Sequence, residues 1–278
     1  MRKLNVGRAT VHLINLGDLG YRLKDVDNVP ENQWRPKYAD VFENVHNYPS
    51  QCVFISLPGK SLLVDAGNYS LFATPDSEYT IPGYKPPPDL IDQLSKIGVA
   101  REDVDYVIIT HAHFDHYAGV TIKSGSNYVP AFPKARYFLG SQDFENPETQ
   151  KSLLDPNSED SHTLGVLREA GVLELVEQDK KISDAVEIIA SPGESPGHKI
   201  VKINSEGQTL YCLGDLFHHS CEVENPTWMA SWDDPKENIE SRHRLLDIAS
   251  KENALLAPSH MPLGRVQKTP TSFKYVEM

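Results

Sequence analysis

Three histidines and one aspartate lie within six residues of this chain, at positions 111, 113, 115 and 116. They are His111, His113, Asp115 and His116, and they directly follow residues 104–109. That run is short, β-branched and nearly unbroken in its apolar character, which is typical of a buried strand. Neutral imidazole and carboxylate are common ligands of divalent transition metals. Side chains at this spacing converge only if the loop folds around something, so the pattern predicts a metal site.

Other predicted strands also end in potential ligands. A double Pro-Gly turn at residues 192–198 carries Glu194 and His198, Asp215 follows a strand over residues 209–214, and His260 follows a strand over residues 254–258. Functional groups in α/β proteins gather at the carboxyl edge of the sheet, so these side chains and the first cluster could together hold two metal ions. The remaining histidines that we weigh are expected to be structural or solvent-exposed: His12, His46, His162, His219 and His243.

The elements that must position these side chains alternate along the chain. Further strands are predicted over residues 10–17, 52–57, 61–65, 135–140, 172–176, 186–190 and 199–203. Helices are predicted over residues 90–97, from 161 or 162 to 170, and after the N-cap pair Asp234-Pro235. The strand over 254–258 is predicted to be the last. Asp65, at the end of its strand, either orients a neighbouring histidine or forms an Asx turn.

Two segments lack clear periodicity. Residues 18–50 are polar, irregular and rich in aromatic side chains, which suits a cap over a site, a dimer contact or an ordered surface extension. Residues 74–88 contain five prolines, including Pro75, and are predicted to form a loop at the rim of the site. No linker interrupts the pattern, so we expect one domain over residues 1–278.

Composition narrows the class of protein. The chain has 278 residues, 39% of them hydrophobic, and a formal net charge of −12. Its length suits one large α/β domain, and its negative charge argues against nucleic acid as a partner. Three scattered cysteines do not make a disulfide framework, so buried free thiols are expected. The sequence shows neither a signal peptide nor an apolar run of membrane-spanning length, so we expect a cytoplasmic protein without membrane contact.

The motifs resemble those of the metallo-β-lactamase superfamily. The resemblance rests on the His-x-His-x-Asp-His run that begins at His111, the double Pro-Gly turn, Gly214-Asp215 and Pro258-Ser259-His260. The segments at 214–218 and 233–235 are similar to those of the methyl parathion hydrolase-like or lactonase-like branch. The resemblance implies a four-layer αβ/βα sandwich with a binuclear metal centre. It places His111 and His113 on one metal, Asp115, His116 and His260 on the other, and Asp215 between them.

Glu194 departs from the family pattern. The family usually has a histidine there as the third ligand of the first metal, and three alternatives remain open. Glu194 binds the metal directly, it lies behind the ligands, or His198 takes its place. Direct binding would add a negative charge, so that three carboxylates and a hydroxide would neutralise two divalent ions. Zinc is the metal implied by the family, while an added carboxylate favours manganese or iron.

The resemblance implies hydrolysis of a small ester-like substrate by a hydroxide that bridges the two metals. Aryl esters, phosphotriesters and lactones are the leading classes. Asp115, which is also a ligand, and His218 are the predicted catalytic residues. His218 replaces the tyrosine that the family's acyl-homoserine lactonases usually have. It either acts on the substrate as a hydrogen-bond donor or general acid, or has no role. The alternatives are an acyl-homoserine lactonase, an iron-containing redox protein and a degenerate metal-binding member. We expect a small-molecule substrate and allow a homodimer.

Overall fold

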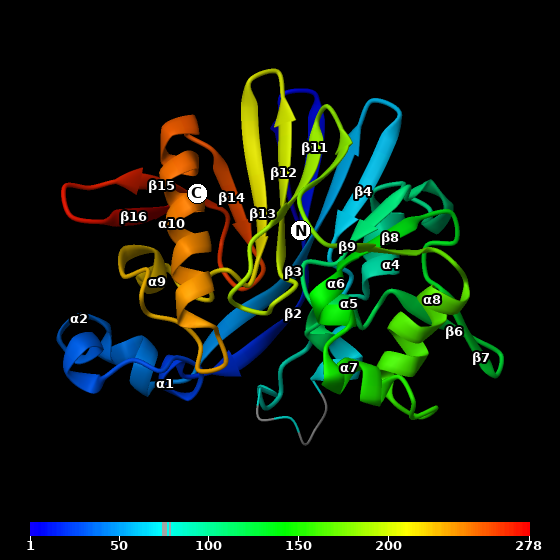
Figure 1. Cartoon of the computed structure of the whole chain (residues 1–278), viewed down its shortest axis with the longest axis horizontal. Helices are drawn as coiled ribbons and strands as arrows, with labels where there is room; N and C mark the ends of the chain where they lie inside the picture. Colours follow the sequence, from blue (N-terminus) through cyan, green and yellow to red (C-terminus); the bar gives the residue numbers. More distant parts are fainter. Residues whose placement is uncertain (74–76, 78) are drawn as a thin grey trace.

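The computed structural model describes residues 1–73, 77 and 79–278, and its centre is formed by two facing β-sheets (Figure 1). Within the described residues, each of these sheets has seven strands. The first sheet has the order β1 (Arg2–Val6), β2 (Ala9–Tyr21), β3 (His46–Leu57), β4 (Lys60–Val64), β5 (Tyr106–Ile108), β8 (Arg136–Gly140) and β9 (Leu173–Val176). The second has the order β10 (Lys180–Ser183), β11 (Val186–Ala190), β12 (Lys199–Ser205), β13 (Gln208–Gly214), β14 (Leu255–Pro258), β15 (Gly264–Lys268) and β16 (Phe273–Glu277). A small hairpin joins β6 (Thr121–Ser124) to β7 (Asn127–Pro130).

The strands bury both faces, because successive side chains of a strand point to opposite sides of the sheet. On β3, Val53 and Ile55 face the core between the two sheets, while Phe54 belongs to the core under the helices of the first sheet. On β13, Cys212 faces the core between the sheets and Leu213 faces the opposite way. Such two-sided burial explains why these strands read as nearly continuous apolar runs.

Helices cover the outer face of each sheet, as Figure 1 shows. On the first sheet, helix α4 (Leu90–Lys96) and helix α8 (Val166–Glu169) pack through Leu94 and Leu167 in one buried cluster with Val107 of β5. On the second sheet, helix α10 (Pro235–Glu252) contributes Leu246 to a buried cluster with Leu213 of β13. The layers therefore run helix, sheet, sheet, helix, which confirms the predicted αβ/βα sandwich. The helices are α1 (Leu23–Val26), α2 (Glu31–Glu43), α3 (Tyr69–Phe72), α4 (Leu90–Lys96), η1 (Arg101–Asp103), α5 (Phe114–Tyr117), α6 (Ser141–Phe144), α7 (Pro147–Ser152), η2 (Ser161–Gly165), α8 (Val166–Glu169), α9 (Ser220–Glu224) and α10 (Pro235–Glu252).

The prediction that residues 18–50 are irregular is wrong. Strand β2 continues through this segment to Tyr21, helices α1 and α2 follow, and β3 begins at His46. Within helix α2, the ring of Trp34 stacks on the ring of Phe42, with the ring centroids 4.8 Å apart. Phe42 also contacts Trp228 edge-on, and this contact holds the helix against the rest of the protein. Its apolar pattern is hard to recognise in the sequence because Pro36 interrupts it and Tyr38 has non-helical backbone angles.

Two strand boundaries also differ from the prediction. The strand predicted over residues 10–17 does not stop at Gly17, which instead marks a register shift in the pairing of β2 with β3. A side chain there would collide with the Tyr69 ring, 1.9 Å from the ideal Cβ position, so glycine is needed for close approach rather than for a turn. The strand at 254–258 is not the last, because the β15–β16 hairpin follows it.

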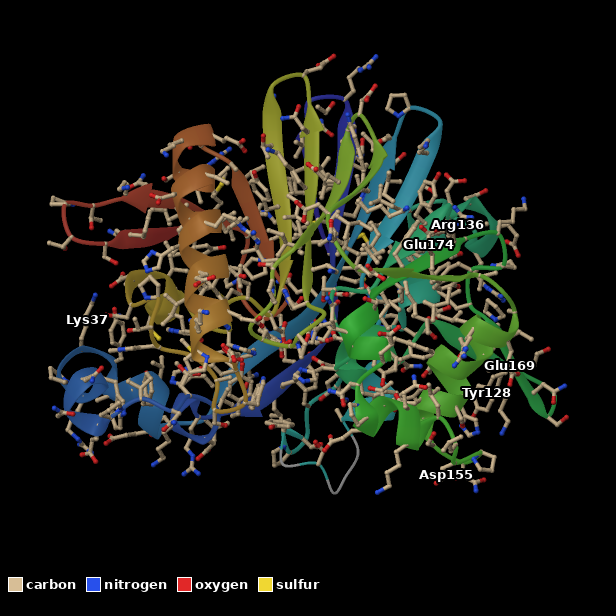
Figure 2. All side chains as sticks on the ribbon, viewed as in Figure 1. Lys37, Tyr128, Arg136, Asp155, Glu169 and Glu174 are labelled. Carbon is tan, nitrogen blue, oxygen red and sulfur yellow. The ribbon has the colours of Figure 1, made fainter. Side chains whose placement is uncertain are left out.

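Charged side chains such as Lys37, Asp155 and Glu169 lie at the periphery (Figure 2). Arg136 on β8 pairs with Glu174 on β9 at 3.2 Å. The cysteines are buried free thiols, as predicted: Cys52, Cys212 and Cys221. Pro75 of the predicted rim loop lies outside the described residues. Across the part of the chain that the structure describes, no helix is both long enough and apolar enough to cross a membrane.

Candidate metal centre

The strand ends bring the predicted ligands into two groups. In the first, the potential ligand atoms all lie within 4.8 Å of one another, and the residues are His111, His113, Glu194 and Asp215. His113 Nδ1 lies 2.9 Å from Glu194 Oε1, and His111 Nε2 lies 3.4 Å from Glu194 Oε2. Glu194 thus lies at the position where the family pattern has a histidine, between the two imidazoles.

The second group meets the same spacing and consists of Asp115, His116, Asp215 and His260. Asp215 Oδ2 lies 3.2 Å from His116 Nε2 and 3.1 Å from His260 Nε2. His260 Nε2 also lies 3.4 Å from Asp115 Oδ2. Asp215 directly follows β13, which is paired in parallel with β14, and His260 lies two residues after the end of β14.

Several buried atoms of these groups lack hydrogen-bond partners. Among the described residues, His111 Nε2, His116 Nε2, Glu194 Oε2 and Asp215 Oδ1 are buried and accept or donate no hydrogen bond. An unsatisfied buried polar atom costs about 1–3 kcal/mol, so four such atoms facing one space call for a ligand. Nitrogen and oxygen donors of this kind suit divalent transition metals, and the residues therefore fit the metal ions that the sequence predicts.

The pKa values of His111 and Asp215 suit metal binding. Burial lowers the pKa of His111 well below its ordinary value, which keeps the imidazole neutral. Burial raises the pKa of the Asp215 carboxyl, but the neighbouring His116 and His260 outweigh this effect. They hold that pKa well below its ordinary value. Neutral imidazole and ionised carboxylate are the forms that bind metal ions. Burial lowers the pKa of His260, but Asp215 and Asp115 outweigh it and raise that pKa to about 10, so metal binding at His260 would release a proton.

His198 is engaged elsewhere. Its Nδ1 lies 3.1 Å from the carbonyl of Ser191, and its Nε2 accepts a hydrogen bond from the backbone N–H of Asp215 at 3.3 Å. Both ring nitrogens are therefore used, which leaves none for a metal. Of the three alternatives for the first group, the geometry favours direct binding by Glu194.

Asp65 lies behind the second group. Its Oδ2 lies 3.0 Å from His116 Nδ1, and its Oδ1 accepts a hydrogen bond from the backbone N–H of Thr110 at 2.8 Å. Its backbone has a φ of 62°, which turns the chain sharply after β4. Of the two sequence-based alternatives, this geometry supports the first, in which the aspartate orients a histidine through its second ring nitrogen.

Asp143 is a site residue that the sequence analysis missed. From helix α6 it accepts hydrogen bonds from Ala112 N at 3.1 Å, Ser195 Oγ at 2.8 Å and Gly197 N at 2.6 Å. It thus connects the loop of His111 and His113 to the turn of Glu194. Side chains at Gly140 and Gly197 would collide with this junction. The only local signal was that Asp143, like the predicted ligands, lies shortly after a strand end.

Replacing Asp143 by alanine is expected to weaken the first metal group selectively. Loss of a residue that holds ligands in place typically lowers metal affinity about 10- to 100-fold. Titration of the metal-free protein, with bound metal measured by elemental analysis, should show one tight site instead of two. Asp105→Ala is the matched control, because Asp105 also accepts a backbone hydrogen bond, from Ser61 N at 2.8 Å, but outside the site. Equal metal affinities in the two variants would contradict this role.

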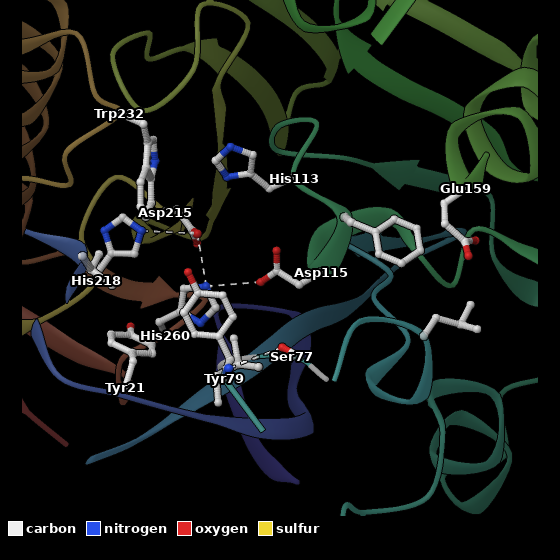
Figure 3. Close-up of a pocket in the computed structure, with 14 residues that line it drawn as sticks. Tyr21, Ser77, Tyr79, His113, Asp115, Glu159, Asp215, His218, Trp232 and His260 are labelled. Carbon is white, nitrogen blue, oxygen red and sulfur yellow. Dashed lines mark hydrogen bonds and ion pairs between the residues drawn. The ribbon is translucent and has the colours of Figure 1, made fainter. Parts of the chain in front are cut away.

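An apolar cavity of about 610 Å³ opens above the two groups (Figure 3). A volume near this value is ordinary for a small-molecule site. Its floor includes ligand candidates of both groups, and its walls are largely apolar or aromatic. The lining residues used below are Leu19, Tyr21, Val26, Leu71, Phe114, Glu159, His218 and Trp232. Leu19, Tyr21 and Val26 come from the 18–50 segment, so this segment covers one side of the site.

His218 and Trp232 lie together at one end of the cavity (Figure 3). His218 Nε2 lies 3.5 Å from Asp215 Oδ2. Burial disfavours the charged imidazole, but the interaction with Asp215 outweighs it and raises the pKa of His218 to about 9. Trp232 Nε1 donates to Glu194 Oε1 at 3.2 Å. The indole is a second residue that the sequence analysis missed, since nothing local distinguishes it from a surface aromatic.

A buried ion pair supports the loop that carries Asp215 and His218. Arg242 Nη2 donates to Glu222 Oε2 at 2.7 Å, and both side chains are fully buried. Glu222 also accepts from the backbone N–H of His218 at 3.1 Å, and Arg242 Nε donates to the carbonyl of Leu216 at 2.7 Å. Among the described residues, neither metal group includes any of the histidines expected to be structural or solvent-exposed, which are His12, His46, His162, His219 and His243.

Comparison with known proteins gives the family. The sequence pattern of the Metallo-beta-lactamase superfamily matches residues 47–260, well over half of the chain. An N-acyl homoserine lactonase of Bacillus cereus is 25% identical over 226 residues, which cover 78% of this chain and 83% of that protein. The N-acyl homoserine lactonase AttM of Rhizobium radiobacter is 24% identical over 238 residues, with coverages of 78% and 83%.

Solved structures have the same fold. The hydrolase AbOPH of the beta lactamase superfamily superposes with a TM-score of 0.80 at 19% identity, covering 99% of this chain and 96% of that one. AidC, a dizinc quorum-quenching lactonase in complex with a product, superposes with a TM-score of 0.77 at 21% identity, with coverages of 100% and 97%. The predicted resemblance is confirmed by the sequence match and the shared architecture: this chain belongs to the metallo-β-lactamase superfamily.

Proposed function

We propose that this protein is a metal-dependent hydrolase that opens the lactone ring of N-acyl homoserine lactones or closely similar lactones. The observation that carries the proposal is the pair of ligand groups that share Asp215 at the floor of an apolar cavity. The similarity to N-acyl homoserine lactonases over most of both chains supports lactones over the other ester-like classes. A lactone ring can reach the polar floor while its acyl chain lies against apolar walls.

Each proposed ligand has a part in this assignment. His111, His113 and Glu194 would hold one ion, Asp115, His116 and His260 would hold the other, and Asp215 would lie between them. When bound, two divalent ions would polarise the ester carbonyl and supply an activated water molecule. Zinc is the proposed metal by family, with manganese or iron as alternatives because of Glu194.

The chain's own residues would orient the substrate. We propose His218 Nε2 as a hydrogen-bond donor to an oxygen of the lactone, because the ring lines the cavity 3.5 Å from Asp215. It would take the part of the tyrosine that related lactonases usually have. Trp232 forms the adjacent wall and, through its indole N–H, holds Glu194 Oε1 on the side away from His111.

The decisive experiment is a substrate panel on the purified protein loaded with zinc, manganese or iron. N-hexanoyl-homoserine lactone should be opened with release of one proton per molecule, followed by titration at constant pH, and a chelator should stop the reaction. Faster hydrolysis of an aryl ester or a phosphotriester than of any lactone would replace the lactone assignment. Absence of turnover on the whole panel, with metal bound, would contradict a hydrolase.

Glu194→His is expected to shift metal preference toward zinc. The substitution restores a third nitrogen ligand and removes one negative charge, and nitrogen donors suit zinc better than oxygen-preferring metals. Competition between zinc and manganese, read by elemental analysis of the bound metal, measures the shift. Glu148→Gln, an exposed carboxylate on α7, removes the same charge outside the site. Unchanged metal content, metal preference and pH–rate profile would argue against direct binding by Glu194.

A further inference from the structure

The cavity is lined by three carboxylates and by histidines, of which His218 and His260 lie against Asp215 at the metal end. Among the described lining residues there is no lysine or arginine, whereas three carboxylates line it, those of Asp115, Glu159 and Asp215. Two of them, Asp115 and Asp215, are proposed metal ligands, so bound ions would compensate their charge. Glu159 belongs to neither ligand group and makes no ion pair with the residues that the structure describes. Its charge therefore remains uncompensated.

Glu159 lies across the cavity from the His218 end. In Figure 3 its carboxylate is on the far side of Asp115, well away from His218 and Trp232. The cavity wall also includes the apolar side chains of Leu71 and Phe114. A substrate whose reacting ester lies over the metal groups would direct the end of its acyl chain along this wall toward Glu159.

We propose that this site accepts lactones with a neutral or cationic acyl chain and discriminates against those whose chain ends in a carboxylate, with Glu159 as the specificity-determining residue. This inference rests on the proposed function and adds to it the charge class of the substrate. It names a residue that takes no part in metal binding and that lies outside the motifs of the sequence.

Two further features act in the same direction. The chain carries a net charge of −12, so its long-range field repels anions from the cavity mouth. Glu194 in place of the usual histidine makes the metal end one charge less positive, so the ions attract an anionic substrate less strongly. Water at the rim of the cavity screens the repulsion between a substrate carboxylate and Glu159. We therefore expect this repulsion to lower kcat/KM on the order of tenfold rather than to block the reaction.

Three matched substrates test the inference. N-hexanoyl-, N-(6-aminohexanoyl)- and N-adipoyl-homoserine lactone have acyl chains of the same carbon number and end in a methyl group, an ammonium group and a carboxylate. On the metal-loaded protein we expect kcat/KM for the adipoyl substrate to be about tenfold lower than for the hexanoyl substrate. The amino substrate should equal or exceed the hexanoyl one. The adipoyl deficit should shrink as salt is raised.

Two variants assign the effect to its residue. Glu159→Gln should reduce the adipoyl deficit, and Glu159→Lys should abolish or reverse it. Glu148→Lys makes the same change in net charge on the exposed surface of α7, away from the cavity, and should leave the deficit unchanged. If both lysine variants change the ratio equally, the long-range field and not Glu159 sets the preference, and the assignment is overturned.

The substrate measurements distinguish a wrong charge preference from a wrong assignment as a lactonase. Equal kcat/KM for hexanoyl and adipoyl lactones would overturn the inference and leave the lactonase proposal standing. If no lactone is opened, the lactonase proposal fails, and p-nitrophenyl hexanoate compared with mono-p-nitrophenyl adipate still measures the charge preference. Equal rates on that ester pair, or no turnover of either, would overturn the inference as well.

Discussion

Asp215→Ala is expected to empty both metal groups at once and to abolish hydrolysis. Asp215 is the one residue common to the two groups among the described residues. Loss of a residue that merely holds a ligand in place costs about 10- to 100-fold in metal affinity. Loss of a ligand shared by both ions should therefore exceed about 100-fold for each of them. Elemental analysis after dialysis should show less than one metal per chain, and lactone opening should fall to background.

The control for this variant is Asp184→Ala. Asp184 is an exposed aspartate in the turn between β10 and β11, and its removal changes the net charge of the chain equally. It should retain two metals and full activity. If Asp215→Ala keeps two metals with wild-type affinity, Asp215 does not lie between the ions. If it loses one metal only, it belongs to a single group and the proposed binuclear arrangement must be redrawn.

Arg242→Met is expected to give the largest loss of stability of any single substitution considered. The guanidinium is fully buried and donates to Glu222, Leu216 O and Trp228 O. Methionine keeps much of the volume but leaves Glu222 as a buried carboxylate without its counter-charge. Breaking a buried ion pair by removing one partner costs about 3–5 kcal/mol, which is a large share of a typical domain's stability. Urea unfolding followed by circular dichroism measures the loss.

The loss of unfolding free energy in Arg242→Met should be larger at pH 8 than at pH 5.5, because a further carboxylate, that of Asp233, lies near the Arg242–Glu222 pair. Burial raises the pKa of Asp233 to about 7, against a partial opposing effect of His218 and Arg242. The folded state then holds a proton that the unfolded state releases above about pH 4, so this group lowers stability as pH rises toward 7. Removal of Arg242 takes away the opposing positive charge, which deepens that decline and extends it to higher pH.

Two further variants separate the ion pair from packing. Lys268→Met breaks a surface pair with Asp247, 2.8 Å apart, and should unfold like the parent protein, because exposed pairs contribute little. The double variant Arg242→Met with Glu222→Gln removes both charges and should recover part of the loss. If the single and double variants are equally unstable, lost packing and lost carbonyl partners, rather than the unpaired charge of Glu222, account for the effect.

The fold class and the candidate ligands were predictable because their signals are local. The strand at β5 and the residues that follow it stand next to each other in the sequence, so apolar periodicity and side-chain chemistry together predict a strand that ends in His111. The same reasoning placed Asp215 and His260 at strand ends. Parallel strands end at the same edge, so the sandwich then brings these side chains together.

The supporting residues were not predictable, because their partners lie far away in the chain. Asp143 accepts hydrogen bonds from Ala112 and Gly197, which lie 31 and 54 positions away. In the sequence, Arg242 looks like one more charge on a polar helix, yet it is fully buried against Glu222. Helix α2 is hard to predict because Pro36 interrupts its pattern and because Tyr38 and Phe42 pack on Trp228, which lies far away in the chain.

The sequence by itself therefore determined the chemistry: a His-x-His-x-Asp-His run and further ligand types at strand ends, hence a metal site of the metallo-β-lactamase superfamily. Only the tertiary structure shows that the ring nitrogens of His198 are paired with Ser191 and Asp215, which is why we propose Glu194 and not His198 as a ligand. The tertiary structure also forms the cavity and places Glu159 in its lining. Local patterns encode backbone periodicity and ligand type, whereas the pairing of individual polar atoms depends on segments that meet only when the chain is folded.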